Sequence, residues 1–180
     1  VRSSAASDVY KRQVLDTARL KYNLGEHLNV DSRSVHAFII GEHGDSELAA
    51  WSSATVSGVP INTFCEMRGH FNHDEATERI AENVKNSAYE IIAKKKATYF
   101  GVAMAVRRIC EAIIRDEKSI LPVSNLMHGE FGISDISLSM PAIVGAHGVE
   151  NRIPITLDEE ETEKLQSSAG TLKKIIEEVL

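Results

Sequence analysis

The chain has little of what several classes of protein require. It contains only two cysteines, Cys65 and Cys110, so free buried thiols in a reducing compartment are expected rather than a disulfide. No apolar run approaches the roughly 20 residues that cross a bilayer. The formal net charge of −6 comes without the clustered Lys and Arg of a nucleic-acid-binding surface. The composition predicts a soluble cytoplasmic protein with neither a nucleic acid nor a membrane as partner.

Three common motifs are also missing. The sequence contains no G-x-G-x-x-G, no G-x-x-x-x-G-K-[ST] and no G-x-S-x-G, the signatures of a dinucleotide loop, a P-loop and a nucleophile elbow. Residues 1–13 (VRSSAASDVYKRQ) lack the apolar stretch of a secretory signal, and we expect a polar, flexible lead there. With 180 residues and 43% hydrophobic content, the chain is long enough to form one domain around a substantial core.

Apolar residues at helical spacing predict four helices. Asn72 with Glu75, and Thr156 with Glu159, resemble capping boxes that open two of them. The second and third helices are expected to form a hairpin or one long, bent helix. The predicted helices span residues 16–28, 74–95 and 100–115, and the fourth follows residues 156–159.

Strand-like runs occur between these helices. A buried strand over residues 34–41 is expected to end in a glycine-containing turn, and residues 48–61 form an ambiguous extended stretch. Pro141 predicts that its strand is an edge or contains a bulge. An antiparallel pair of strands is expected over residues 119–126 and 136–144, joined by a turn at residues 128–132. A last short strand is expected over residues 153–157. The order of elements predicts an α+β fold, a mainly antiparallel sheet packed against long helices.

His43 is the best candidate for a general acid or base among the seven histidines. It lies in a glycine-flanked turn directly after the predicted buried strand, with Glu42 and Asp45 close in sequence. An ordinary loop histidine is the alternative interpretation. His70 and His73 lie three residues apart but without a carboxylate or cysteine set at zinc-ligand spacing, so no metal site is predicted.

A working histidine needs a carboxylate to orient it, and an acid substrate needs a guanidinium that can bind a carboxylate bidentately. Asp16 and Arg19 offer this pair, and three residues apart they lie on the same side of one helical turn. A capping aspartate with a solvated arginine is the alternative interpretation.

Five segments together resemble the L-lactate dehydrogenase branch of the lactate/malate dehydrogenase family. The resemblance runs from about Val14 to the C-terminus. The segments are residues 14–19 (VLDTAR), 41–47 (GEHGDSE), 86–92 (NSAYEII), 121–124 (LPVS) and 141–145 (PAIVG).

The resemblance implies a role for each of four residues. His43 would donate a proton to the carbonyl of pyruvate during reduction and accept it during lactate oxidation, while hydride moves to or from NAD. Asp16 would hold His43, and Arg19 would bind the substrate carboxylate. Thr98 matches a family position that lines the pocket near the methyl group of the substrate. The intact protein is expected to be a homotetramer.

The resemblance also raises an effector site. Bacterial members of this family are often activated by fructose 1,6-bisphosphate, which binds between subunits. The matching positions here hold Lys21 and His36. The histidine fits the pattern, whereas lysine replaces the family's arginine and presents a point charge in place of a planar fork. A surface lysine and a strand histidine are the alternative.

The nucleotide-binding half of the family has no counterpart in this sequence. We therefore expect residues 14–180 to be the substrate-binding domain of a fragment, with residues 1–13 as foreign sequence, and the chain alone to bind NAD poorly and turn over little. The alternatives are a malate dehydrogenase C-terminal domain, which shares the same three catalytic roles, and a non-catalytic domain retained for its subunit-binding helices.

Overall fold

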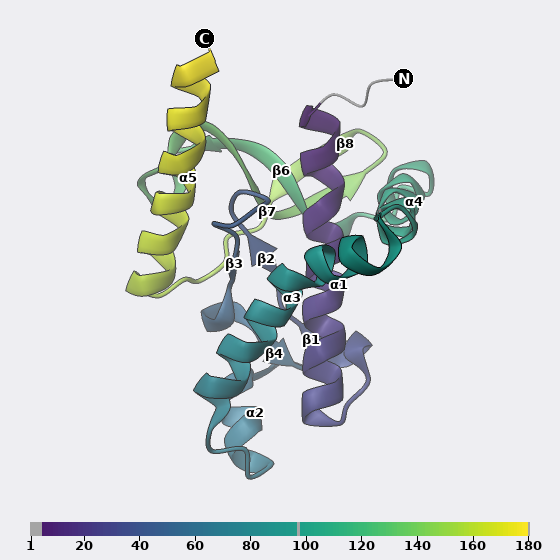
Figure 1. The fold of residues 1–180 in the computed structure, drawn as a ribbon, viewed down its shortest axis with the longest axis vertical. Helices are drawn as coiled ribbons and strands as arrows, with labels where there is room; N and C mark the ends of the chain where they lie inside the picture. Colours follow the sequence, from purple (N-terminus) through teal and green to yellow (C-terminus); the bar gives the residue numbers. More distant parts are fainter. Residues whose placement is uncertain (1–4, 97, 180) are drawn as a thin grey trace.

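The computed structural model describes residues 5–96 and 98–179, and a long helix lies at its centre. This helix, α1 (Ala5–Leu28), is surrounded by the other helices and the sheets (Figure 1). Leu20, Leu24 and Leu28 recur every four residues on one face of α1, and all three are almost completely buried. These leucines belong to one of the hydrophobic clusters that form the core.

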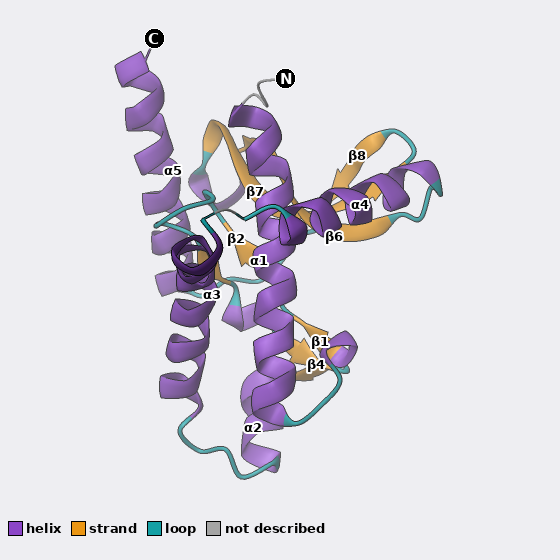
Figure 2. Ribbon diagram, turned by 45° about the vertical axis from the view of Figure 1, so that its right-hand side comes forward, coloured by secondary structure: helices purple, strands orange, loops and turns teal. Residues whose placement is uncertain are grey.

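Four further α-helices occur in the described part of the chain. α3 and α4 both pack against α1. Figure 2 shows that α4 runs across the direction of α3, so the chain bends between them and does not form an antiparallel hairpin. None of the described helices is long and apolar enough to span a membrane. These helices are α2 (Ile61–Met67), α3 (His73–Lys95), α4 (Phe100–Ile114) and α5 (Glu159–Val179).

All strand pairs of the described residues are antiparallel. In the largest sheet the strand order is β6-β7-β8, and α5 packs against β7. Its strands are β6 (Ser119–His128), β7 (Ser134–Gly145) and β8 (Gly148–Arg152). The two small sheets pair β4 (Thr55–Val56) with β1 (Val35–His36) and β5 (Val59–Pro60), and β2 (Ile39–Ile40) with β3 (Leu48–Ala49). The predicted α+β fold, an antiparallel sheet packed against long helices, is confirmed.

The first helix begins earlier than predicted. Residues 5–13, expected to be part of a flexible lead, continue α1 toward the N-terminus, and Gln13 is completely buried. Residues 1–4 of that predicted lead lie outside the described residues. The idea that residues 1–13 are foreign sequence stays a prediction.

The predicted strand over residues 34–41 was wrong as one element. It is divided into β1 and β2, which belong to different sheets. The backbone N–H of Ile39 donates to the Thr17 hydroxyl of α1 at 2.9 Å, and Gly41 pairs with Ser139 of β7. Backbone groups of this short segment therefore bond to four different elements, β4, β3, α1 and β7, which no local pattern encodes.

The prediction for Pro141 offered an edge strand or a bulge, and β7 is the middle strand of its sheet and not an edge. Pro141 lies opposite Pro122 of β6, and a register irregularity follows at Ile143/Val144. The expected strand over residues 153–157 was also wrong, because β8 ends before it at Arg152.

Both predicted capping boxes were wrong. Asn72 makes no side-chain hydrogen bond to the start of α3. At α5 the capping box is formed by Asp158 and Glu161, not by Thr156 and Glu159. The Glu161 N–H donates to Asp158 Oδ1 at 2.8 Å, and the Asp158 N–H donates to Glu161 Oε2 at 3.2 Å.

The two cysteines differ in their surroundings. Both are free thiols, as expected, but only Cys65 is buried, whereas Cys110 is exposed. The expectation that both are buried was therefore wrong for Cys110, because its side of α4 does not face the core.

Candidate active site

One turn of α1 brings a carboxylate and a guanidinium together. Arg19 Nη1 donates a 2.7 Å hydrogen bond to Asp16 Oδ1, and the two side chains are only 17% and 5% exposed. Asp16 does not cap the helix, because α1 begins at Ala5. The pair is therefore a largely buried ion pair, and not the capping aspartate with a solvated arginine that was the alternative.

The loop that carries His43 follows β2 and is attached to three elements. Gly41 exchanges two 3.0 Å backbone hydrogen bonds with Ser139 of β7. Its carbonyl also accepts a 3.0 Å hydrogen bond from the side-chain amide of Gln13 in α1. The Glu42 N–H donates to the Ser168 hydroxyl of α5 at 2.8 Å. Segments far apart in the sequence thus determine where the imidazole lies.

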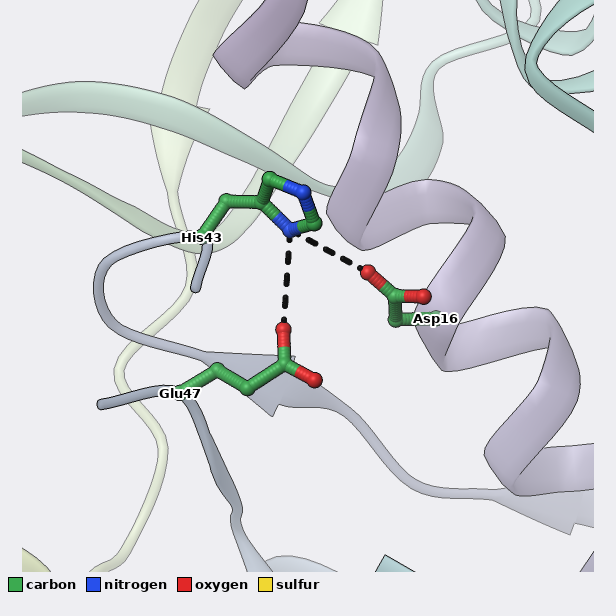
Figure 3. A group of neighbouring side chains, drawn as sticks. All are labelled: Asp16, His43 and Glu47. Atoms are coloured by element: carbon green, nitrogen blue, oxygen red, sulfur yellow. Dashed lines mark ion pairs between the residues drawn. The ribbon is translucent and has the colours of Figure 1, made fainter. Parts of the chain in front are cut away.

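His43 faces two carboxylates with the same ring nitrogen (Figure 3). Its Nδ1 lies 3.3 Å from Asp16 Oδ2 and 3.6 Å from Glu47 Oε2. The other ring nitrogen points away from both carboxylates (Figure 3). A carboxylate on Nδ1 fixes the tautomer and the ring orientation, which leaves Nε2 to exchange a proton with a ligand.

The electrostatic surroundings favour the protonated imidazole. Burial alone lowers the pKa of His43, but the neighbouring carboxylates of Asp16 and Glu47 outweigh it and raise the pKa to about 9. Burial raises the pKa of Glu47, and the nearby imidazole opposes that rise. His43 therefore carries a proton at neutral pH and can act as a general acid.

A cavity of about 380 Å³ opens beside His43, between its loop, β6, β7 and α5. This volume lies within the range of small-ligand pockets. Apolar side chains form much of its lining, and besides His43 the polar side chains are serines and the carboxylates of Glu42 and Asp135. The lining residues beyond the His43 loop are Ser124, Leu126, Asp135, Ile136, Ser137, Leu172 and Ile176.

Asp16, His43 and Glu47 are also the one group of described residues whose donor atoms, all within 4.8 Å of one another, have the composition of a metal site. Arg19 already supplies a positive charge to Asp16, and a proton bound with a pKa of about 9 occupies the imidazole. A divalent cation must displace that proton, because metal ligands bind in the deprotonated form. A metal ion at this cluster would therefore compete with that proton and with Arg19 for the same atoms.

Three other predicted site residues lie outside this ion-paired cluster. Thr98 is half-buried in the connection between α3 and α4. Lys21 and the exposed His36 line a different cavity of about 320 Å³, together with Arg108 of α4. Burial lowers the pKa of Lys21. The structure thus brings the two predicted effector residues into one cavity, separate from that of His43.

Sequence reasoning missed three residues of the site. Glu47 follows His43 by four positions, a spacing that could have drawn attention to it. Gln13 was assigned to the flexible lead, and Ser168 carried no signal in a helix of polar residues. Both hold the His43 loop through hydrogen bonds between distant segments.

Comparisons with known proteins show the family to which the chain belongs. The family model for the lactate/malate dehydrogenase, alpha/beta C-terminal domain, matches residues 14–180. The chain is 52% identical over 163 residues to an L-lactate dehydrogenase of Acetivibrio thermocellus, covering 91% of this chain and 51% of the relative. It is 49% identical over 164 residues to L-lactate dehydrogenase 1 of Lactococcus lactis subsp. lactis, covering 91% and 50%.

Solved structures give the same result. The minor L-lactate dehydrogenase from Enterococcus mundtii, in its ligands-bound form, matches with a TM-score of 0.87 and 42% identity, covering 93% of this chain and 53% of that one. A lactate dehydrogenase from a Medee basin deep-sea metagenome library matches with a TM-score of 0.85 and 41% identity, covering 90% and 52%. The chain spans about half the length of these relatives.

Proposed function

Because the chain belongs to the lactate/malate dehydrogenase family and matches its C-terminal domain, we propose that it is the substrate-binding and proton-transfer domain of an L-lactate dehydrogenase. The whole protein would interconvert L-lactate and pyruvate with NAD. The observation that carries the proposal is the connected series Arg19–Asp16–His43, in which one carboxylate joins a guanidinium to an imidazole. The names of the relatives above favour lactate over malate as the substrate.

Each residue of this series has a chemical role in the proposal. His43 donates a proton from Nε2 to the carbonyl oxygen of pyruvate and takes it back during lactate oxidation. Asp16 orients the ring and stabilises its charged form. Arg19 uses one of its N–H groups on Asp16, and the remaining donors are available for the carboxylate of the substrate. Thr98 contributes to the pocket wall near the substrate methyl group.

The described residues do not by themselves fit NAD. Their strand pairs are all antiparallel, whereas the dinucleotide crevice of this family type forms at the ends of parallel strands. In the proposal NAD binds to a separate domain of the whole protein and supplies or accepts the hydride. The part played by this chain is to bind the acid, orient it and move the proton.

The whole protein is proposed to be a cytoplasmic homotetramer. Large apolar side chains that are exposed on this chain, such as Phe100, Met104 and Ile114 of α4, support an interface with other parts of an assembly. Analytical ultracentrifugation of the whole protein tests the proposal. A monomer at micromolar concentration would contradict it.

Lys21 and His36 are proposed to bind fructose 1,6-bisphosphate as an activator. Their shared cavity with Arg108 supports this, because phosphate groups are bound by clustered cationic side chains. Arg108 already pairs with Glu117 at 2.6 Å, so its charge is partly compensated. Changing His36 to Ala is expected to abolish activation of the whole protein by the sugar bisphosphate. An unchanged activation in this variant would contradict the proposed effector site.

The experiment that tests the main proposal begins with the gene upstream of the codon for Val14. An in-frame strand, Gly-x-Gly-x-x-Gly and helix unit is expected there. The protein that it encodes should oxidise NADH with pyruvate far faster than with oxaloacetate, and the His43→Gln variant should lose this activity. A preference for oxaloacetate would favour malate dehydrogenase. A native start immediately before this segment would favour a non-catalytic interaction domain.

A further inference from the structure

Glu47 is a buried carboxylate that the proposed roles of Arg19, Asp16 and His43 leave unexplained. Its side chain is only 7% exposed, and its Oε2 lies 3.6 Å from His43 Nδ1. Transferring a carboxylate from water to such a site costs free energy unless a nearby positive charge compensates. The burial of Glu47 beside the imidazole is therefore compensated where the imidazole carries a positive charge.

The charges of the cluster indicate the role of Glu47. Asp16 is shared, because Oδ1 accepts from Arg19 at 2.7 Å while Oδ2 faces His43 at 3.3 Å. One carboxylate therefore serves two positive groups whenever His43 is protonated. Glu47 supplies the second negative charge, so that two carboxylates balance one guanidinium and one imidazolium.

Other charged groups face the imidazole less directly. Glu42 belongs to the same loop, and its carboxylate accepts a 2.6 Å hydrogen bond from Ser46. Asp135 of β7 lines the cavity beside His43, whereas α5 contributes the apolar Leu172 and Ile176 there. Asp16 and Glu47, in contrast, both form ion pairs with the imidazole of His43.

We propose that Glu47 is a positioning residue for the proton-transfer step: a second carboxylate that, with Asp16, holds the proton on His43 Nδ1 and turns Nε2 toward the substrate. The proposal rests on the proposed function for the meaning of that proton. With two carboxylates on one nitrogen, the imidazole has one preferred orientation and one preferred protonation state.

The direction of the effect follows from the sign of the charges. An opposite charge within about 4–6 Å favours the charged form of a group, and the pKa of His43 is raised with Glu47 among the causes. Carbonyl reduction needs the protonated imidazole and alcohol oxidation needs the neutral one. Glu47 therefore extends the reductive direction to higher pH and moves the onset of oxidation upward.

The test is a pH titration of His43 in the 180-residue chain, monitored by ¹H–¹⁵N NMR of its imidazole. The His43 signal is assigned by its absence from the His43→Gln spectrum. Glu47→Gln removes the charge with little change in volume, and we expect the midpoint of the His43 titration to fall by about 1 pH unit. Glu47→Asp keeps the charge at a longer distance, so its His43 midpoint should lie between those of the unmodified chain and Glu47→Gln.

Asp45→Asn is the matched control, because Asp45 is exposed in the same loop and also loses one negative charge. Solvent and salt screen its charge, so its midpoint should stay within about 0.3 pH units of the unmodified chain. A Glu47→Gln midpoint as close as that of Asp45→Asn would overturn the proposal. If Glu47→Gln does not give the dispersed spectrum of a folded protein, the Glu47→Asp variant, whose carboxylate lies farther from His43, is the test. An unchanged His43 midpoint in that variant would then overturn the proposal.

A kinetic measurement on the whole protein separates this proposal from the proposed function. The alkaline limit of kcat for pyruvate reduction should move to lower pH in Glu47→Gln by the same amount as the NMR midpoint. The KM for pyruvate at low pH should change little, because Arg19 is untouched. A whole protein that does not reduce pyruvate contradicts the proposed function, while the NMR result still decides the role of Glu47.

Discussion

The protonation of His43 makes the stability of the fold depend on pH in a specific direction. The folded pKa of about 9 exceeds the ordinary value of 6.5. A raised pKa contributes stability that is fully present below the unfolded value and is lost as pH rises through the folded value. The difference corresponds to about 3 kcal/mol at full effect. Because the side chain is partly exposed, we expect about 2 kcal/mol after solvent screening.

The assay is urea unfolding at several pH values between 7 and 10, with the fluorescence of Trp51 as the signal. Trp51 is the single tryptophan and packs against the core cluster that contains the leucines of α1. The free energy of unfolding should fall with pH in the unmodified chain relative to the His43→Gln variant, whose side chain does not titrate. Lys21 and Cys65, with their pKa values shifted by burial, are present in both chains and cancel in the difference.

The result that refutes this reasoning is a difference between the two chains that stays constant, or grows, from pH 7 to pH 10. It would mean that the two carboxylates do not hold a proton on the imidazole in the folded chain. The predicted general acid would then be neutral at physiological pH.

Five further substitutions test the packing of the fold and the cap of α5. Gly41→Ala introduces a side chain at φ +92° with Ser168 Oγ only 3.0 Å from the new Cβ, and should cost about 1–3 kcal/mol of stability. Gly58→Ala, at φ +86° with open space around it, should cost less in the same urea titration. Asp158→Ala should lower stability by about 1 kcal/mol, whereas Thr156→Ala should not, which thermal melts would check. Leu24→Ala should lose about 2–5 kcal/mol by denaturant unfolding, and a smaller loss would mean that the core relaxes around it.

The helices that sequence patterns predicted well are those with a strong helical period. The predicted ranges 74–95 and 100–115 differ from α3 and α4 by one residue at one end. The antiparallel pair of β6 and β7 was also expected, with its turn. In these segments the apolar side chains face one neighbour throughout, so the local pattern and the tertiary contacts agree.

The failures occur where backbone groups bond to distant partners. Residues 34–41 have the composition of a strand, yet the N–H of Ile39 bonds to Thr17 and Gly41 pairs with Ser139. The capping signal at Thr156 was misplaced by two residues, because Asp158 offers the same chemistry nearer to the first turn of α5. Several polar residues in a row make a cap easy to predict and hard to position.

The sequence by itself determined the fold class, and it singled out His43, Asp16 and Arg19 through the family motifs that carry them. These depend on residue types and spacings, which are local properties of the chain. Only the tertiary structure decided that Glu47 shares the Nδ1 of His43 with Asp16, and that Gln13 holds the loop at Gly41. Distances between side chains of separate segments depend on how helices and strands pack, and no pattern along the chain contains them.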